Sequence, residues 1–224
     1  MITPMWFVAT LTLAQPAHTA NFDYGGLPTL SNASIAMQAA NVTFKLAGQT
    51  ATTNELIVFK NTSQSPVDAT LVVPRFRCGG SAGDFPTFPV SATWNKTTMT
   101  LADGSPSKAD AALTFSKPVT SAVHFGPGET AALRIQYSTS FGSAGYGSNQ
   151  SVVGFFMTGP QAAVPQVNVS FSYNQRTVFD LPTVLPSWQW QIGKTGSAIR
   201  LSNFAPQGQL VTAEFYGGGF HSIH

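Results

Sequence analysis

The 224-residue sequence has unusually little charge. Lysine and arginine number 11 and aspartate and glutamate 9, so charged residues make up 9% of the chain, against about 25% in an ordinary globular domain. The cations are scattered and the formal net charge is +2, which leaves no basic stripe to hold a phosphate backbone. We therefore expect no nucleic-acid partner, and solubility has to come from serine, threonine, asparagine and glutamine.

Cysteine and long hydrophobic runs are also scarce. The one cysteine, Cys78, cannot form an internal disulfide, so stability has to come from packing. After residue 20 no stretch reaches the roughly 18 consecutive apolar residues of a membrane helix. The mature chain is therefore expected to have no transmembrane segment.

Residues 1–20 have the pattern of a secretory signal peptide, although they lack the usual lysine or arginine near the start. A short apolar stretch at residues 6–14 leads into Gln15-Pro16 and then into small residues up to Ala20, the order of an h-region and a cleavage region. The alternative is an N-terminal strand. We predict a cleaved leader over residues 1–20, and export to the periplasm or the extracellular space.

Helical periodicity is missing almost everywhere, and alternation with period two takes its place. Residues 133–138, 167–174 and 188–192 alternate between apolar and polar side chains, as half-buried strands do. Residues 56–59 and 71–73 are apolar throughout, which is typical of central strands. Fifteen prolines and twenty glycines leave room for at most one short helical turn, near residues 107–112.

Turn-forming residues interrupt these runs about every ten positions. They lie at residues 61–66, at Asp103-Gly104, the dipeptide that a type I′ turn prefers, and at residues 126–129. This spacing predicts an all-β protein, an antiparallel β-sandwich of about twelve strands in one or two lobes. The candidate boundary is the Gly/Ser-rich segment 139–149, a linker or a long loop, between an N-terminal lobe (21–138) and a C-terminal lobe (150–224).

Several short motifs resemble an uncharacterised family of secreted bacterial proteins, a domain of unknown function. The similar segments are Ala20-Asn21-Phe22-Asp23, Gly25-Gly26-Leu27, Ile35-Ala36-Met37, Phe59-Lys60-Asn61-Thr62, Val72-Val73-Pro74, Phe156-Met157-Thr158-Gly159 and residues 199–206. Phe22 interrupts the family's Asn-Asp pair, and Gln38-Ala39-Ala40 stands where the family has acidic residues. The resemblance implies export and a β-rich fold, and it implies no catalytic residues.

Candidate chemistry is sparse. Residues 79–83 match the G-x-S-x-G pattern of a nucleophilic serine, but Pro86 and Pro89 forbid the helix that should follow. His221 and His224 are spaced as metal ligands without a third ligand nearby. We therefore predict no catalytic residue, no metal site and no cofactor.

Aromatic side chains are the stronger candidates for binding, because they fill a core or stand on a wet face as stacking platforms. Trp188 and Trp190 share one face of a predicted strand, Trp94 lies beside a possible turn at Asn95-Lys96, and Tyr146 lies in the glycine-rich segment. These four are the predicted ligand contacts, with core packing as the alternative for the tryptophans.

The sequence thus favours an exported non-enzymatic binding or structural module of the bacterial cell envelope or extracellular space. Its expected partner is an envelope protein or glycan. The alternative is a secreted hydrolase acting on envelope carbohydrate, for which two of the nine carboxylates would have to face one cleft.

Overall fold

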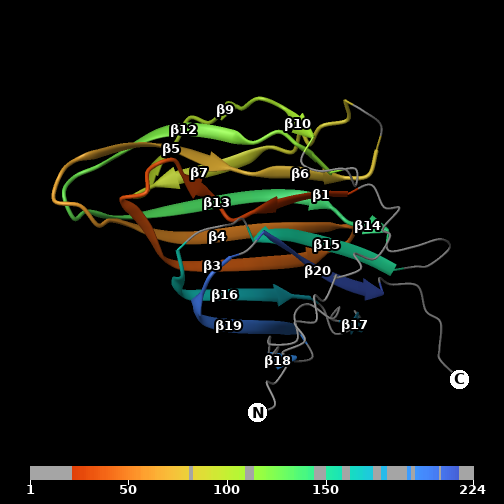
Figure 1. The fold of residues 1–224 in the computed structure, drawn as a ribbon. Helices are drawn as coiled ribbons and strands as arrows, with labels where there is room; N and C mark the ends of the chain where they lie inside the picture. Colours follow the sequence, from red (N-terminus) through yellow and green to blue (C-terminus); the bar gives the residue numbers. More distant parts are fainter. Residues whose placement is uncertain are drawn as a thin grey trace, which may run out of the picture.

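A computed structural model describes residues 22–80, 83–108, 114–143, 150–157, 162–173, 178–180, 191–192, 195–206 and 208–216 (Figure 1). These residues form twenty strands and no helix, hence no helix that could cross a membrane. The predicted all-β class is confirmed. Twelve of the described strands have four residues or more, in line with the expected number, and the other eight are too short to leave an alternating pattern.

The largest layer is an eight-stranded sheet, here called sheet C. Its strands lie in the order β18 (Gln191–Ile192), β19 (Gly196–Phe204), β16 (Val164–Ser172), β3 (Ile35–Ala47), β4 (Thr50–Asn61), β13 (Thr130–Ser140), β7 (Val90–Trp94) and β8 (Thr97–Thr98). Figure 1 shows the long strands β13, β4, β3, β16 and β19 side by side. The alternation predicted at residues 133–138 lies on β13, and that predicted at residues 167–174 lies on β16 as far as Ser172.

Two further sheets face sheet C. Sheet A has the order β10 (Ser107–Lys108), β11 (Thr114–Ser116), β6 (Arg75–Cys78), β1 (Phe22–Gly26), β15 (Gln150–Met157), β20 (Gln209–Tyr216) and β17 (Val178–Asp180), and β14 (Gly142–Ser143) pairs with β15. Sheet B has the order β2 (Thr29–Leu30), β5 (Val67–Val73), β12 (Val119–Phe125) and β9 (Ala102–Asp103).

One hydrophobic core joins the three sheets. Phe44 of sheet C meets Phe155 of sheet A edge to face, with ring centroids 5.6 Å apart, and Trp94 of sheet C meets Phe125 of sheet B at 5.1 Å. Each fully buried phenylalanine contributes about 1.5–3 kcal/mol through the apolar surface that it removes from water. Sheet C therefore forms one layer of a sandwich, and sheets A and B form the other.

Two of the seventeen described strand pairs are parallel, β1 with β15 and β3 with β16. The other described pairs are antiparallel, as predicted. Each parallel pair joins a strand that precedes residues 139–149 to a strand that follows them, so the two sides of this segment share sheets A and C. The segment itself falls partly outside the described residues, at 144–149.

The predicted turns are only partly present. A hairpin turn at residues 126–129 joins β12 to β13, with Gly128 at a φ of 64°. The type I′ turn predicted at Asp103-Gly104 is wrong, because Gly104 does not have a positive φ and Asp103 belongs to β9, which pairs with β12. The helical turn predicted near 107–112 is wrong at residues 107–108, which form β10, and residues 109–112 lie outside the described part.

Candidate functional site

The outward side of sheet C is largely polar. Its central strands alternate so that apolar side chains such as Val42, Phe44 and Ile57 point into the core and mostly polar ones point out, with Leu56 and Val58 as half-buried apolar exceptions. The outward polar residues, here called the outer face, are Asn41, Thr43, Lys45, Thr52, Asn54, Lys60, Arg134, Gln136, Ser138, Asn168, Ser170, Ser172, Arg200 and Ser202. Each of these side chains is exposed or half-buried.

Side chains of the outer face bond to one another across strands. In the parallel pair β3 and β16, Asn41 faces Asn168 and Thr43 faces Ser170. The Asn168 amide donates a hydrogen bond to Asn41 Oδ1 at 2.5 Å, and the Ser170 hydroxyl donates to Thr43 Oγ1 at 3.3 Å. Between β4 and β13, the hydroxyls of Thr52 and Ser138 lie 3.0 Å apart. Such cross-strand pairs hold polar groups in fixed positions.

The reason for this register is a near-repeat in the sequence. Residues 41–44 read Asn-Val-Thr-Phe and residues 168–171 read Asn-Val-Ser-Phe, and the two segments lie in register. On the inward side of the same pair, the rings of Phe44 and Phe171 stack with centroids 4.6 Å apart. Buried phenylalanines therefore fix the register that aligns the polar groups outside.

The outer face carries exposed cations and no described carboxylate. Lys45, Lys60, Arg134 and Arg200 all point to solvent, and none forms an ion pair with a described carboxylate. The one acidic residue on the described strands of sheet C is Glu55, which points into the core. The opposite layer differs, because Arg75, Arg77 and Lys117 are each paired with aspartates there.

Glu55 is the most unusual titratable group in the described core. The residue is 2% exposed and its neighbour Tyr137 4%, and neither the carboxyl oxygens nor the Tyr137 hydroxyl makes a hydrogen bond of acceptable geometry. Burial raises the pKa of Glu55 well above its ordinary value, and the nearby Tyr137 hydroxyl opposes this only in part. Burial, followed by the charge of Glu55, likewise raises the pKa of Tyr137. Burial inside the sandwich thus favours the neutral form of the carboxyl over the charged form.

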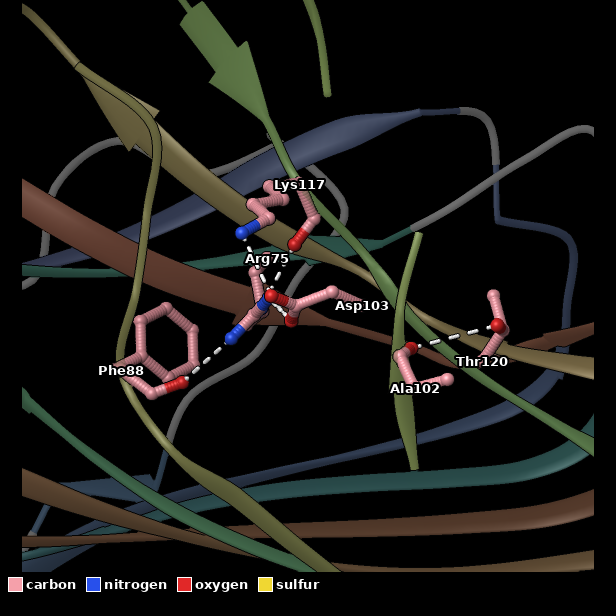
Figure 2. Close-up of polar contacts among 6 residues, drawn as sticks. All are labelled: Arg75, Phe88, Ala102, Asp103, Lys117 and Thr120. Carbon is pink, nitrogen blue, oxygen red and sulfur yellow. Dashed lines mark hydrogen bonds and ion pairs between the residues drawn. The ribbon is translucent and has the colours of Figure 1, made fainter. Parts of the chain in front are cut away.

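Arg75 is a second buried charged residue, 4% exposed, and it is fully partnered (Figure 2). Its Nε donates to the carbonyl oxygen of Lys117 at 2.8 Å, Nη1 donates to that of Phe88 at 3.0 Å, and Nη2 donates to Asp103 Oδ1 at 2.6 Å. Lys117 Nζ lies 2.7 Å from Asp103 Oδ2. The hydrogen bonds from Lys117 and then Arg75 lower the pKa of Asp103.

Arg77, two residues along β6, binds Asp23 and Asp84. Its guanidinium donates to both Asp23 oxygens, at 2.7 and 3.0 Å, and to Asp84 Oδ1 at 2.9 Å. The hydrogen bond with Asp23 is the main cause that raises the pKa of Arg77. Both arginines therefore fasten loops to sheets, which is a structural task, and their charges are already matched.

Of the four aromatic residues predicted as ligand contacts, the described residues include only Trp94. Trp94 ends β7, and its ring lies against Phe59 and Phe125 at centroid distances of 6.3 and 5.1 Å, half-buried in the packing between sheets B and C. The predicted turn at Asn95-Lys96 is present, since both residues have positive φ values of 46° and 72°. Tyr146, Trp188 and Trp190 lie outside the described residues, so their role as ligand contacts stays a prediction.

Sequence analysis missed both the outer face and Glu55. The strand pattern could have revealed Glu55, because residues 51, 53, 55, 57 and 59 share one face and four of them are Ala, Thr, Ile and Phe. The four cations are far apart in sequence, and only the strand register brings them to one face. Among the described residues, no three His, Cys, Asp or Glu side chains come together as metal ligands would.

No family model and no curated protein matches the chain, which agrees with its resemblance to an uncharacterised family. Solved structures do share its architecture. A "putative nutrient binding protein" from Legionella pneumophila is 15% identical, with a TM-score of 0.70 over 89% of this chain and 73% of that one. The chain shares its fold with the Legionella protein. An M1 zinc metallopeptidase from Deinococcus radiodurans is 12% identical, with a TM-score of 0.37 over 84% of this chain and 43% of that one, a likeness too slight to indicate a common fold.

Proposed function

We propose that the protein is an exported, non-enzymatic binding module of the bacterial cell envelope or extracellular space, and that the outer face of sheet C binds its ligand. The observation that carries this proposal is the set of hydrogen-bonded polar pairs, Asn41 with Asn168, Thr43 with Ser170 and Thr52 with Ser138. Side chains already held in place lose little conformational entropy on binding, so such a surface is preorganised for a ligand.

The chemistry of the outer face suits a glycan of the envelope. Amide and hydroxyl groups both donate and accept hydrogen bonds, as sugar hydroxyls do, and the exposed strands offer rows of them. The Legionella protein of the same fold is described as a "putative nutrient binding protein", which supports a binding role here.

Export rests on the sequence pattern of residues 1–20. We expect the chain made in a bacterial host to be recovered outside the cytoplasm and to begin at Asn21. Cell fractionation followed by intact-mass measurement checks this, and a chain built without residues 1–20 serves as the control that stays inside. Recovery of the full-length chain in the cytoplasm alone would contradict export.

Binding through the outer face is tested with two matched substitutions. Thr43→Glu places a larger, charged side chain among the polar pairs, whereas Thr70→Glu makes the same change on an exposed position of β5 in sheet B. Binding to a panel of neutral and acidic envelope polysaccharides, measured by calorimetry, should be lost in the first variant and kept in the second. Equal binding by the two variants would mean that the ligand binds to another surface.

Tyr146 gives the cleanest test of the aromatic contacts predicted from sequence. Replacing Trp94 by Ala would remove packing against Phe59 and Phe125, so a loss of binding could follow from a loss of folding. Tyr146→Ala should weaken glycan binding if that ring stacks on a sugar, and unchanged affinity would remove Tyr146 from the site.

A further inference from the structure

We infer that the ligand of the outer face is an acidic polysaccharide, a polymer of sugars that carry carboxylate groups. This inference rests on the proposed function, because it names the ligand class of the same surface. It follows from where the four cations stand, none of them paired with a described carboxylate, and from what lies between them.

Arg134 and Arg200 lie at the two ends of one row across sheet C. The register runs from Arg134 through Leu56, Asn41 and Asn168 to Arg200. Four strand spacings separate the two arginines, which is about 19 Å.

Lys60 and Lys45 lie above and below that row along the strand direction. Lys60 follows Leu56 by four residues on β4, and Lys45 follows Asn41 by four residues on the antiparallel neighbour β3. The two lysines are therefore about 26 Å apart. Together the four cations mark the corners of a diamond whose centre lies at Asn41, between Leu56 on β4 and Asn168 on β16.

These separations decide the size of the ligand. Charges in salt water interact over a Debye length of about 8–10 Å, so a small anion on this face reaches one cation only. A polymer with repeated carboxylates reaches several at once, and each further contact forms at the high effective concentration that linkage provides.

The charges are also free to act. Arg75, Arg77 and Lys117 in the opposite layer are matched by Asp23, Asp84 and Asp103, whereas the described strands of sheet C present no acidic side chain outward. A polyanion would thus find several cations together on this layer, whereas on the other layer three cations are paired with aspartates and the exposed Lys108 lies on the edge strand β10.

The groups between the cations separate a polysaccharide from a lipid surface. An interfacial lipid site presents apolar side chains that enter the membrane among its basic residues. Here the diamond holds the hydrogen-bonding groups of Asn41, Asn168, Thr43 and Ser170, and its outward apolar side chains Leu56 and Val58 are half-buried, so no apolar side chain projects from it to enter a membrane. Sugar hydroxyls match them and acyl chains do not.

The test compares polygalacturonate with its fully methyl-esterified form, which has the same backbone without the charge. We expect binding to the acid and not to the ester, and a fall in affinity from low to physiological ionic strength. The variant Arg134→Gln/Arg200→Gln should weaken binding about two- to fivefold for each arginine lost, the range of single exposed ion pairs. Lys108→Gln, a charge removed from an exposed position of β10 in sheet A, is the control and should bind as the unaltered protein does.

Each other result overturns the inference in a distinguishable way. The protein could bind the acid and the ester equally, with binding abolished by Thr43→Glu and unaffected by Arg134→Gln/Arg200→Gln. That result would support a binding module at the outer face and would rule out an acidic ligand. Binding to phosphatidylglycerol vesicles and to neither polymer would replace the polysaccharide by a membrane. Loss of affinity in Lys108→Gln as large as in an Arg134→Gln single variant would show attraction by net charge alone, without a site.

Discussion

At the scale of single residues, Glu55 is the position where the sequence and the fold conflict most. A carboxyl group among Val42, Ile57 and Ile135 loses the solvation that stabilises its charge. Burial beside Tyr137 raises the pKa of Glu55, so the folded protein favours the protonated carboxyl more strongly than the unfolded chain does. Because the folded state then holds a proton that the unfolded chain releases above its ordinary pKa, folding is linked to pH.

The sign of this linkage gives the first prediction. The pKa of Glu55 is raised in the folded protein, so stability falls as pH rises above the unfolded value of about 4.3 and continues to fall up to the folded value. Glu55→Gln removes the titration. Urea unfolding from mildly acidic to mildly alkaline pH should show the variant gaining stability relative to the unaltered protein as pH rises.

The matched control is Asn54→Gln, at the exposed position next to Glu55 on β4, which neither adds nor removes a titratable group and should leave the pH dependence nearly unchanged. If Glu55→Gln and the unaltered protein kept a constant difference in unfolding free energy at every pH, Glu55 would not carry the linkage.

Gly25 gives the second prediction at this scale. A methyl group there would collide with the ring and hydroxyl of Tyr137, because β1 crosses directly over β13. Gly25→Ala should therefore destabilise the fold by about 1–3 kcal/mol, the usual effect of overpacking. Gly126→Ala adds a methyl that meets its nearest neighbour at 3.4 Å and should cost less. Urea midpoints compare the two, and equal losses would mean that β1 can shift away from Tyr137.

At the scale of elements, Arg75 ties together the places where the chain changes sheet. The chain passes from β5 in sheet B to β6 in sheet A at Pro74, and from β11 in sheet A to β12 in sheet B at Lys117. Arg75 bonds the carbonyl of Lys117, and the Lys117 N–H bonds the carbonyl of Arg75 in return. The Arg75 side chain also donates a hydrogen bond to the carbonyl of Phe88, which lies just before β7 of sheet C.

Arg75→Met should destabilise the protein by about 2–4 kcal/mol, because two buried carbonyl groups lose their donor. Arg75→Lys should recover little, since a lysine ammonium lacks the planar fork that reaches three partners. Arg134→Met, at an exposed position, should change stability by less than about 0.5 kcal/mol. Urea unfolding measures all three, and a fully stable lysine variant would show that charge alone is sufficient.

Local pattern predicted the strands and missed how they are paired. Alternation is a property of one strand, so it located β13 and β16 and the inward face of each. The parallel pairing of β3 with β16 depends on residues more than a hundred positions apart in sequence, and alternation says nothing about which strands are neighbours. For the same reason Lys45, Lys60, Arg134 and Arg200 appeared scattered in sequence, although the register gathers them on one face.

Turn prediction failed at Asp103-Gly104 for a related reason. The dipeptide favours a tight turn when neighbouring strands are free to pair with each other, yet β9 pairs with β12 and Asp103 is held by Arg75 and Lys117. Tertiary partners thus override a local preference. At Asn95-Lys96, β7 pairs with β8 directly and the turn forms, and the two hydrogen bonds between Asn95 and Ala132 of β13 are compatible with that turn.

At the scale of the whole molecule, the two parallel pairs decide how the chain unfolds. Segments before and after residues 139–149 share sheets A and C, and their side chains share one core, as Phe44 with Phe171 and Phe155 shows. Neither segment can bury its side chains in this shared core without the other segment. We therefore expect a single cooperative unfolding transition, and a fragment that ends at residue 143 should stay unfolded.

Tryptophan fluorescence can report on each segment separately. In a chain that begins at Asn21, Trp188→Phe/Trp190→Phe leaves Trp94, which contacts Phe59 and Phe125, and Trp94→Phe leaves the pair beyond residue 150. In each variant the urea transition seen by fluorescence should coincide with the one seen by far-ultraviolet circular dichroism, because loss of β16 from the edge of β3 exposes the core around Phe44. Trp94→Phe lowers stability in the core, so the comparison is made within each variant and not between them. A fluorescence transition that precedes or follows the loss of circular dichroism would mean that the two segments unfold as separate lobes, despite the sheets that they share.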